Sequence, residues 1–157
     1  MDRRGAGGPV GRPRPLSLRA LKPLFVDTGA FLAKEVAADQ HHDAAQAYWQ
    51  RIAADRPRLY SSEHILDETA TLLARRTSYA WAAQWGRDVM EAGLEWLPAE
   101  RQDLLDAFGL MRKFADQAVS FTDCLSFILM KKAGLRDVFG FDGHFTAAGF
   151  RLRPGEE

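Results

Sequence analysis

The stretch Leu24-Phe25-Val26-Asp27-Thr28-Gly29-Ala30-Phe31 decides the fold. Its apolar start predicts a short buried strand that ends at Asp27, and the residues beyond predict a helix to about Val36. In a chain where strands and helices alternate, a carboxylate at a strand end points into the crevice where such sheets bind ligands. Asp27 is therefore a candidate functional residue as well as a marker of the fold.

The same alternation continues along the chain. Helical spacing of apolar residues and short apolar runs predict helices over 41–54, 62–76, 79–92, 99–115 and 123–133, and strands over 59–61, 94–97, 138–141 and, as a final edge, 149–152. Ser62 and Thr122 are the expected N-caps of two of these helices. Short links between alternating strands and helices predict an α/β fold, with a mainly parallel sheet covered by helices.

Length and composition indicate one domain. The 157 residues can bury a substantial core, and we expect the single domain to span residues 23–153. Residues 1–22 are rich in Arg, Gly and Pro and lack hydrophobic periodicity, so we predict a disordered basic tail.

Charge and cysteine content narrow the classes of protein. The 21 basic and 21 acidic residues cancel, which counts mildly against a strongly basic nucleic-acid binder, although acidic metal ligands would hide a basic surface in this sum. The single cysteine, Cys124, excludes an internal disulfide and fits a reducing compartment. No apolar stretch approaches the roughly 20 residues that span a bilayer, and the first twenty residues lack the apolar core of a signal peptide. We therefore expect a cytoplasmic protein that does not contact a membrane.

Three further acidic residues occupy settings comparable to that of Asp27. Asp123 opens a predicted helix, Asp142 follows the apolar run 138–141, and Glu68 shares a helix stripe with Ile65 and Leu72. A charge on an inward stripe is costly unless it is paired or binds a metal. The neighbouring Asp67 projects roughly 100° away around the helix, towards solvent, and is the alternative if the helix is rotated.

Three of the four acids also have an ordinary structural explanation. Asp27 is a good helix N-cap, Asp123 complements a helix dipole, and Asp142 before Gly143 suits a turn. The complete set favours a functional interpretation. Converging carboxylates repel one another unless a hard divalent cation neutralises them, which predicts metal-dependent chemistry on phosphate. His144, close to Asp142, could contact the substrate, and no zinc-binding or Cys/His pattern is present in the sequence.

These residues and their surroundings resemble the PIN domain family, and within it the VapC-like toxins of bacterial toxin–antitoxin pairs. The resemblance covers about residues 24–152. It rests on the order and spacing of four short motifs rather than on any one of them. The matching stretches are Phe25-Val26-Asp27-Thr28-Gly29-Ala30-Phe31, Leu66-Asp67-Glu68, Ser120-Phe121-Thr122-Asp123-Cys124-Leu125-Ser126 and Gly140-Phe141-Asp142-Gly143-His144-Phe145.

The resemblance implies a three-layer α/β/α sandwich with ribonuclease activity that depends on Mg²⁺ or Mn²⁺. It assigns the acidic, metal-binding site to Asp27, Glu68, Asp123 and Asp142 and places Thr122 beside them as a polar aid to water or substrate. It further implies a homodimer and inhibition by a small cognate antitoxin. The N-terminal extension departs from the family pattern, in which the first aspartate comes within a few residues of the start.

The leading hypothesis is hydrolysis of phosphodiester bonds in RNA, with Asp27 and Asp123 as the principal metal ligands and Glu68 and Asp142 completing the site. A phosphatase or DNA nuclease that uses the same acids is one alternative, and a non-catalytic PIN-fold binding module is another. The sequence leaves open the RNA target, the cleavage position, the antitoxin and whether one or two ions bind.

Overall fold

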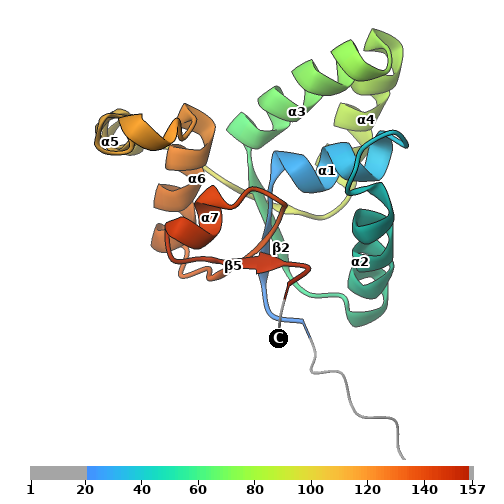
Figure 1. The fold of residues 1–157 in the computed structure, drawn as a ribbon. Helices are drawn as coiled ribbons and strands as arrows, with labels where there is room; N and C mark the ends of the chain where they lie inside the picture. The colour runs from blue at the N-terminus through green and yellow to red at the C-terminus, as the bar shows by residue number, and fades with distance from the viewer. Residues whose placement is uncertain (1–20, 156–157) are drawn as a thin grey trace, which may run out of the picture.

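A five-stranded sheet lies between helices in the computed structural model, which describes residues 21–155 (Figure 1). Every neighbouring pair of strands is parallel. The spatial order is β3-β2-β1-β4-β5, and the strands are β1 (Leu24–Val26), β2 (Leu59–Ser62), β3 (Glu95–Leu97), β4 (Asp137–Phe139) and β5 (Arg151–Arg153). The prediction of an α/β fold with a mainly parallel sheet is confirmed.

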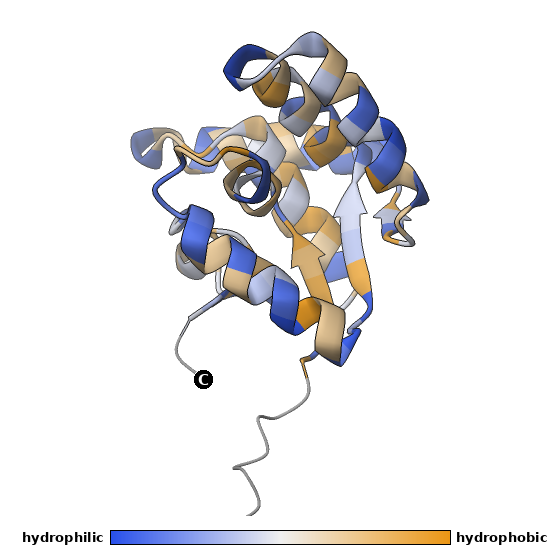
Figure 2. Cartoon of the chain, turned by 90° about the vertical axis from the view of Figure 1, so that its right-hand side faces the viewer, coloured by the Kyte–Doolittle hydropathy of each residue, from blue (hydrophilic) through white to orange (hydrophobic). Residues whose placement is uncertain are grey.

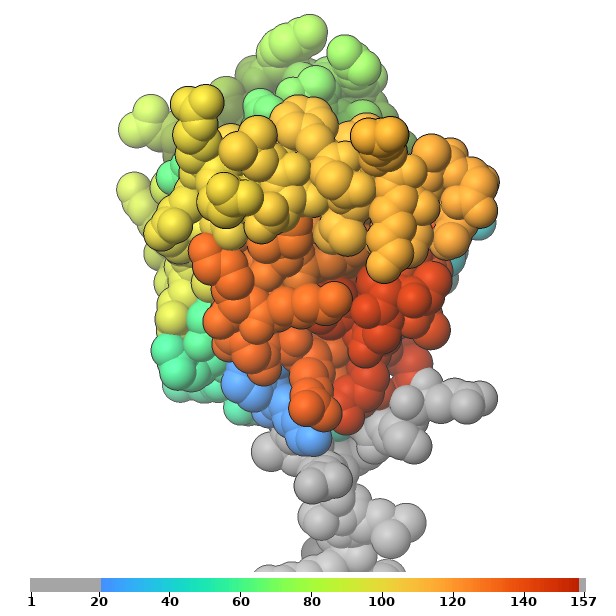
Figure 3. Space-filling model, turned by 90° about the vertical axis from the view of Figure 1, so that its left-hand side faces the viewer, coloured from blue at the N-terminus to red at the C-terminus, as the bar shows by residue number. Residues whose placement is uncertain are grey.

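Helices cover both faces of this sheet. The helices are α1 (Thr28–Glu35), α2 (His42–Asp55), α3 (Glu63–Arg76), α4 (Tyr79–Glu91), α5 (Arg101–Lys113), η1 (Ala115–Gln117), α6 (Phe121–Lys132) and α7 (His144–Ala147). Helices α1 to α4 pack together on one side, and α5 to α7 lie on the other (Figure 1). Figure 3 shows α5 lying across α6, with α7 beside α6. The molecule is therefore the expected three-layer α/β/α sandwich.

The central strands are apolar because both of their faces are covered. All three residues of β1 are buried, and Phe25, Phe139 and Phe145 are among the largest fully buried side chains. In Figure 2, hydrophobic colour is concentrated in the middle of the molecule and hydrophilic residues occupy much of the outer helix surfaces. This core fixes the strand ends from which the candidate functional residues project.

The strand order reverses beside β1. The chain passes from β1 outwards to β2 and β3, and then returns to place β4 on the opposite side of β1. The connections that leave β1 and β4 therefore diverge, which opens a crevice at the carboxyl ends of these two strands. Asp27 follows β1 and Asp142 lies in the loop after β4, so both belong to this crevice.

Several predicted boundaries need correction. Helix α6 begins at Phe121 and its N-cap is Ser120, whose hydroxyl accepts a hydrogen bond from the backbone N–H of Asp123, so the assignment of Thr122 as the cap was wrong. Strand β4 ends at Phe139, which places Asp142 in the following loop instead of at the strand end. Helix α7 was not predicted. Ser62 caps α3 as expected, through a hydrogen bond from the N–H of Ile65.

The predicted tail, residues 1–22, lies outside the described residues except for Leu21 and Lys22. Leu21 is half-buried and packs against the core. Within residues 21–155, no helix is both long enough and apolar enough to cross a bilayer.

Candidate active site

A pocket of about 340 Å³ opens at the carboxyl end of the sheet. The predicted acids Asp27, Glu68, Asp123 and Asp142 all line it, although they come from four different segments of the chain. None of the described residues that line this pocket is a lysine or an arginine. The fold thus gathers carboxylates without gathering cationic side chains to neutralise them.

Asp27 combines a structural and a potential chemical role. It is the N-cap of α1, where its carboxylate accepts a hydrogen bond of 3.3 Å from the N–H of Gly29. Its backbone N–H donates to the carbonyl of Phe139, which ties it to β4. A Cβ at Gly140 would lie only 3.0 Å from the Cβ of Asp27, so the loop after β4 can pass this closely only because residue 140 has no side chain.

Glu68 faces the pocket from α3. The hydroxyl of Thr28 donates a short hydrogen bond of 2.6 Å to Glu68 Oε2, and it therefore fixes the carboxylate beside the end of β1. Asp67 is exposed. The prediction that Glu68 points inwards and Asp67 points to solvent is confirmed.

Asp123 lies in the first turn of α6 and is only 8% exposed. Its N–H donates to the hydroxyl of Ser120 over 3.0 Å, and its side chain lines the pocket. The dipole of α6 favours a negative charge at this position but supplies only a fraction of a unit charge. The helix end positions Asp123 without providing a full counter-charge.

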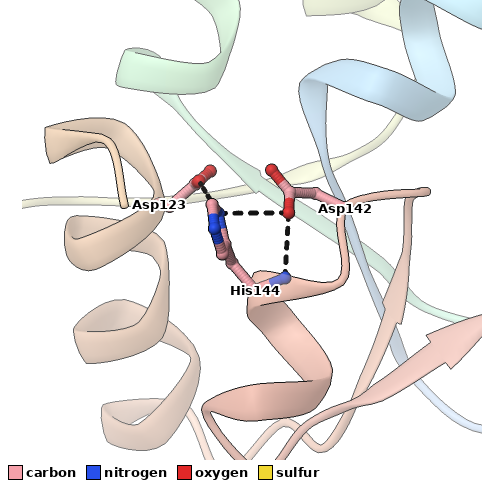
Figure 4. Close-up of side chains that lie close together, drawn as sticks. All are labelled: Asp123, Asp142 and His144. Atoms are coloured by element: carbon pink, nitrogen blue, oxygen red, sulfur yellow. Dashed lines mark hydrogen bonds and ion pairs between the residues drawn. The ribbon is translucent and has the colours of Figure 1, made fainter. Parts of the chain in front are cut away.

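Asp142 and His144 form a compact turn next to Asp123. The backbone N–H of His144 donates to Asp142 Oδ1 over 2.8 Å. The His144 imidazole then points between the two carboxylates (Figure 4), with Nδ1 3.2 Å from Asp142 Oδ1 and 3.5 Å from Asp123 Oδ2. One ligand atom from each of Asp123, Asp142 and His144 can be chosen so that all lie within 4.8 Å of one another.

Burial and mutual repulsion shift the pKa values of the two most buried acids in the pocket. Burial, followed by the charge of Asp123, raises the pKa of Asp27 from 3.8 to about 7. Burial, followed by the charges of Asp142 and Glu68, raises the pKa of Asp123 from 3.8 to about 6. Both directions indicate that negative charge in the pocket is under-compensated by the protein itself.

The structure does not bring Thr122 into this group. Thr122 is half-buried in the first turn of α6, and the pocket is lined instead by the hydroxyl-bearing residues Thr28 and Ser120. Sequence reasoning missed both as site residues. The spacing Ser120-Phe121-Thr122-Asp123 is an N-capping pattern that could have identified Ser120, whereas nothing in the sequence singles out the contact between Thr28 and Glu68.

The donor set suits a hard divalent cation. Carboxylate oxygens are the preferred ligands of Mg²⁺ and Mn²⁺, and a bound cation would supply the charge compensation that the lining residues lack. Besides the carboxylates, the buried Nδ1 of His144 has no hydrogen-bond partner within residues 21–155. The residues present therefore fit a metal ion at this position.

The PIN domain pattern matches residues 24–151, so the chain belongs to the PIN domain family. Among its relatives is the 23S rRNA-specific endonuclease VapC20 of Mycobacterium tuberculosis, which is 35% identical over 134 residues, covering 83% of this chain and 98% of the relative. The crystal structure of VapC20, described as a sarcin–ricin loop cleaving toxin, matches with a TM-score of 0.73 and 31% identity, covering 81% of this chain and 95% of that one.

More distant structures share the fold. VapBC2 from Rickettsia felis, bound to a DNA fragment from its promoter, matches with a TM-score of 0.59 at 11% identity, covering 87% of this chain and 100% of that one. VapBC-1 from nontypeable Haemophilus influenzae matches with a TM-score of 0.59 at 9% identity, covering 85% and 97% of the two chains. These likenesses confirm the PIN-like α/β/α architecture.

Proposed function

We propose that this protein is a metal-dependent endoribonuclease that hydrolyses phosphodiester bonds in RNA and acts as the toxin of a toxin–antitoxin pair. The observation that carries the proposal is the convergence of Asp27, Glu68, Asp123 and Asp142 on one pocket without a lysine or arginine among its described lining residues. A module that only binds partners has no need for repelling, buried carboxylates, and their presence has a cost for folding.

The proposed residue roles follow from position. Asp27 and Asp123, the most buried of the four pocket acids, are the principal metal ligands, and Glu68 and Asp142 complete the site from the rim. Thr28 holds Glu68 in place, and Ser120 holds the start of α6. A divalent ion bound here would lower the pKa of an attacking water and offset charge that develops on the phosphate. The proposal includes the identity of the ion as either Mg²⁺ or Mn²⁺.

Similarity to VapC20 supports RNA as the substrate class. The matched region covers 98% of that endonuclease, so the whole relative, and not an isolated segment of it, corresponds to this chain. We propose ribosomal RNA as the target, and the sarcin–ricin loop of 23S rRNA is the first substrate to test. A small cognate antitoxin completes the proposal, in keeping with the VapBC complexes that share the fold. We further propose that the chain forms a homodimer.

A substrate panel tests this function directly. The purified full-length chain is incubated with a sarcin–ricin stem–loop RNA, the corresponding DNA and a small phosphate ester, each with Mn²⁺, Mg²⁺ or chelator. We expect endonucleolytic cleavage of the RNA alone, and only in the presence of metal. Cleavage of the DNA or the ester in preference to RNA would replace the ribonuclease assignment with a DNA nuclease or a phosphatase.

The toxin role is tested in cells. Induction of the wild-type chain should arrest growth and create new RNA 5′ ends, and induction of Asp27→Asn should do neither. Co-expression of a small DNA-binding protein encoded beside this chain should restore growth and copurify with it. Growth arrest by both forms of the chain would contradict the catalytic account of toxicity.

A further inference from the structure

The pocket that holds the four acids is also lined by a histidine, His144. His144 begins α7, and its imidazole points between Asp123 and Asp142 (Figure 4). Its buried Nδ1 atom lies within ion-pair distance of two carboxylate oxygens, but within residues 21–155 it makes no hydrogen bond of good geometry. A buried polar atom without a well-directed hydrogen bond is costly, and a cation shared with the two carboxylates would satisfy this nitrogen.

The spacing of the atoms matches shared coordination. Adjacent ligands of an octahedral ion with bonds of about 2.1 Å lie roughly 3.0 Å apart. The Nδ1 atom of His144 lies 3.2 Å from Asp142 Oδ1 and 3.5 Å from Asp123 Oδ2. Both separations are close to the adjacent-ligand distance, and one ligand atom from each of the three residues can be chosen so that all lie within 4.8 Å of one another, so side-chain adjustment could place them around one ion.

The local backbone supports this geometry. The N–H of His144 donates to Asp142 Oδ1, so the turn that positions the carboxylate also positions the ring. Phe145, the next residue, is fully buried and packs against Phe127 of α6, with 5.1 Å between ring centroids. The start of α7 is therefore anchored to the helix that carries Asp123, which limits how far His144 can move from the site.

We propose that His144 is a metal ligand through Nδ1, and that this nitrogen makes the site select Mn²⁺ over Mg²⁺. Mg²⁺ prefers oxygen ligands, whereas transition metals accept imidazole nitrogen readily and bind N/O sites more tightly. An all-carboxylate site would discriminate less between the two ions. This inference rests on the proposed function, since it concerns the metal of the same site.

Pulsed electron paramagnetic resonance of bound Mn²⁺ tests the ligand directly, independently of cleavage. The full-length chain loaded with Mn²⁺ should show a nitrogen hyperfine coupling, and labelling with ¹⁵N-histidine should change it. The coupling should vanish in His144→Gln and persist in the matched control His64→Gln, which alters a histidine on α3 that does not line the pocket. The labelling experiment uses wild-type protein and therefore holds even if a variant folds poorly.

Calorimetric titration tests the selectivity. Loss of a ligand should weaken Mn²⁺ binding by about tenfold or more in His144→Gln, because even outer-sphere changes at metal sites cost roughly this much. Mg²⁺ affinity should change by a smaller factor. Bound Mn²⁺ without histidine coupling, together with metal-dependent RNA cleavage, would overturn the role of His144 and leave the proposed function intact. Absence of both Mn²⁺ binding and cleavage would overturn the two together.

Discussion

Asp27 and Asp137 are both almost fully buried, 5% and 3% exposed, at opposite ends of the neighbouring strands β1 and β4. At the amino end of β4, Asp137 accepts a hydrogen bond of 2.6 Å from Arg151, and a second guanidinium, that of Arg153, lies 3.9 Å away. At the carboxyl end of β1, the described residues lining the pocket around Asp27 include further acids and no Lys or Arg. Arginines therefore neutralise the buried carboxylate at the amino end of β4, whereas several carboxylates gather without Lys or Arg at the carboxyl end of β1.

Helix α6 repeats this contrast over its own length. Its last turn carries Lys132, which contacts Asp103 over 2.8 Å, and this hydrogen bond lowers the pKa of the Asp103 carboxyl. Its first turn carries Asp123, whose pKa is raised by burial and by neighbouring acids. We interpret the acids paired with Lys or Arg as part of the scaffold, and the pocket acids, which have no such partner among the described lining residues, as the functional site.

The largest expected difference between the two ends of the sheet is in catalysis. Asp27→Asn or Asp123→Asn should reduce the rate of RNA cleavage by roughly 10³-fold, because loss of a metal ligand removes several kcal/mol of transition-state stabilisation. The matched control Asp137→Asn, which also neutralises a buried aspartate, should retain activity under conditions where it is folded. Single-turnover cleavage assays measure the difference. Full activity in purified Asp123→Asn would show that this pocket is not the active site.

Two neighbouring acids on α3, Glu68 and Asp67, should differ in their effect on the cleavage rate, by a smaller factor. Glu68→Gln should slow cleavage by about 10- to 100-fold, since it weakens the charge of a pocket-lining group that is oriented by Thr28. Asp67→Asn alters an exposed side chain and should leave the rate unchanged. Equal rates for the two variants would show that the inward face of α3 has no part in the reaction.

The same Asp→Asn change should alter stability in opposite directions at the two ends. The pKa of Asp27 in the folded state is raised from 3.8 to about 7. The folded state is therefore favoured by protonated Asp27 below about pH 4, and this contribution to the free energy of unfolding is lost as the pH rises through 7. In metal-free protein at pH 8, Asp27→Asn should therefore raise Tm, by about 3 °C for each 1 kcal/mol recovered, and the gain should vanish towards pH 4.

Asp137→Asn should lower Tm at pH 8 by a comparable amount, because it removes a charged hydrogen bond of 2.6 Å to Arg151. Differential scanning fluorimetry with chelator, from pH 4 to 8, compares the two variants. A lower Tm for Asp27→Asn at pH 8 would mean that its charge is compensated after all.

The fold was largely predictable because its signals are local. The apolar run at 24–26, the Ser62 cap and helical periodicity place the main elements, and alternation implies parallel pairing. Helix α7 escaped prediction because a helix of four residues has too few turns for periodicity to register. The cap of α6 was misplaced because Ser120 and Thr122 are both acceptable N-cap residues, and only the backbone path distinguishes them.

The site was less predictable because its contacts join distant segments. Each acid could be proposed from its own surroundings, and the pocket contains all four. The contact of Thr28 with Glu68, across 40 positions, and the approach of His144 to Asp123 depend on packing between helices. The sequence also does not reveal how Asp137 is neutralised, since its arginine partners reach it only through the pairing of β4 with β5.

Metal-dependent thermal stabilisation tests most directly whether the four pocket acids bind a cation. Wild-type protein and Asp137→Asn should each gain about 5 °C or more in Tm when Mn²⁺ is present at about a hundredfold excess over its Kd, and Asp123→Asn should gain little. A wild-type Tm that does not respond to millimolar Mn²⁺ or Mg²⁺, or an equal response in Asp123→Asn, would contradict the account.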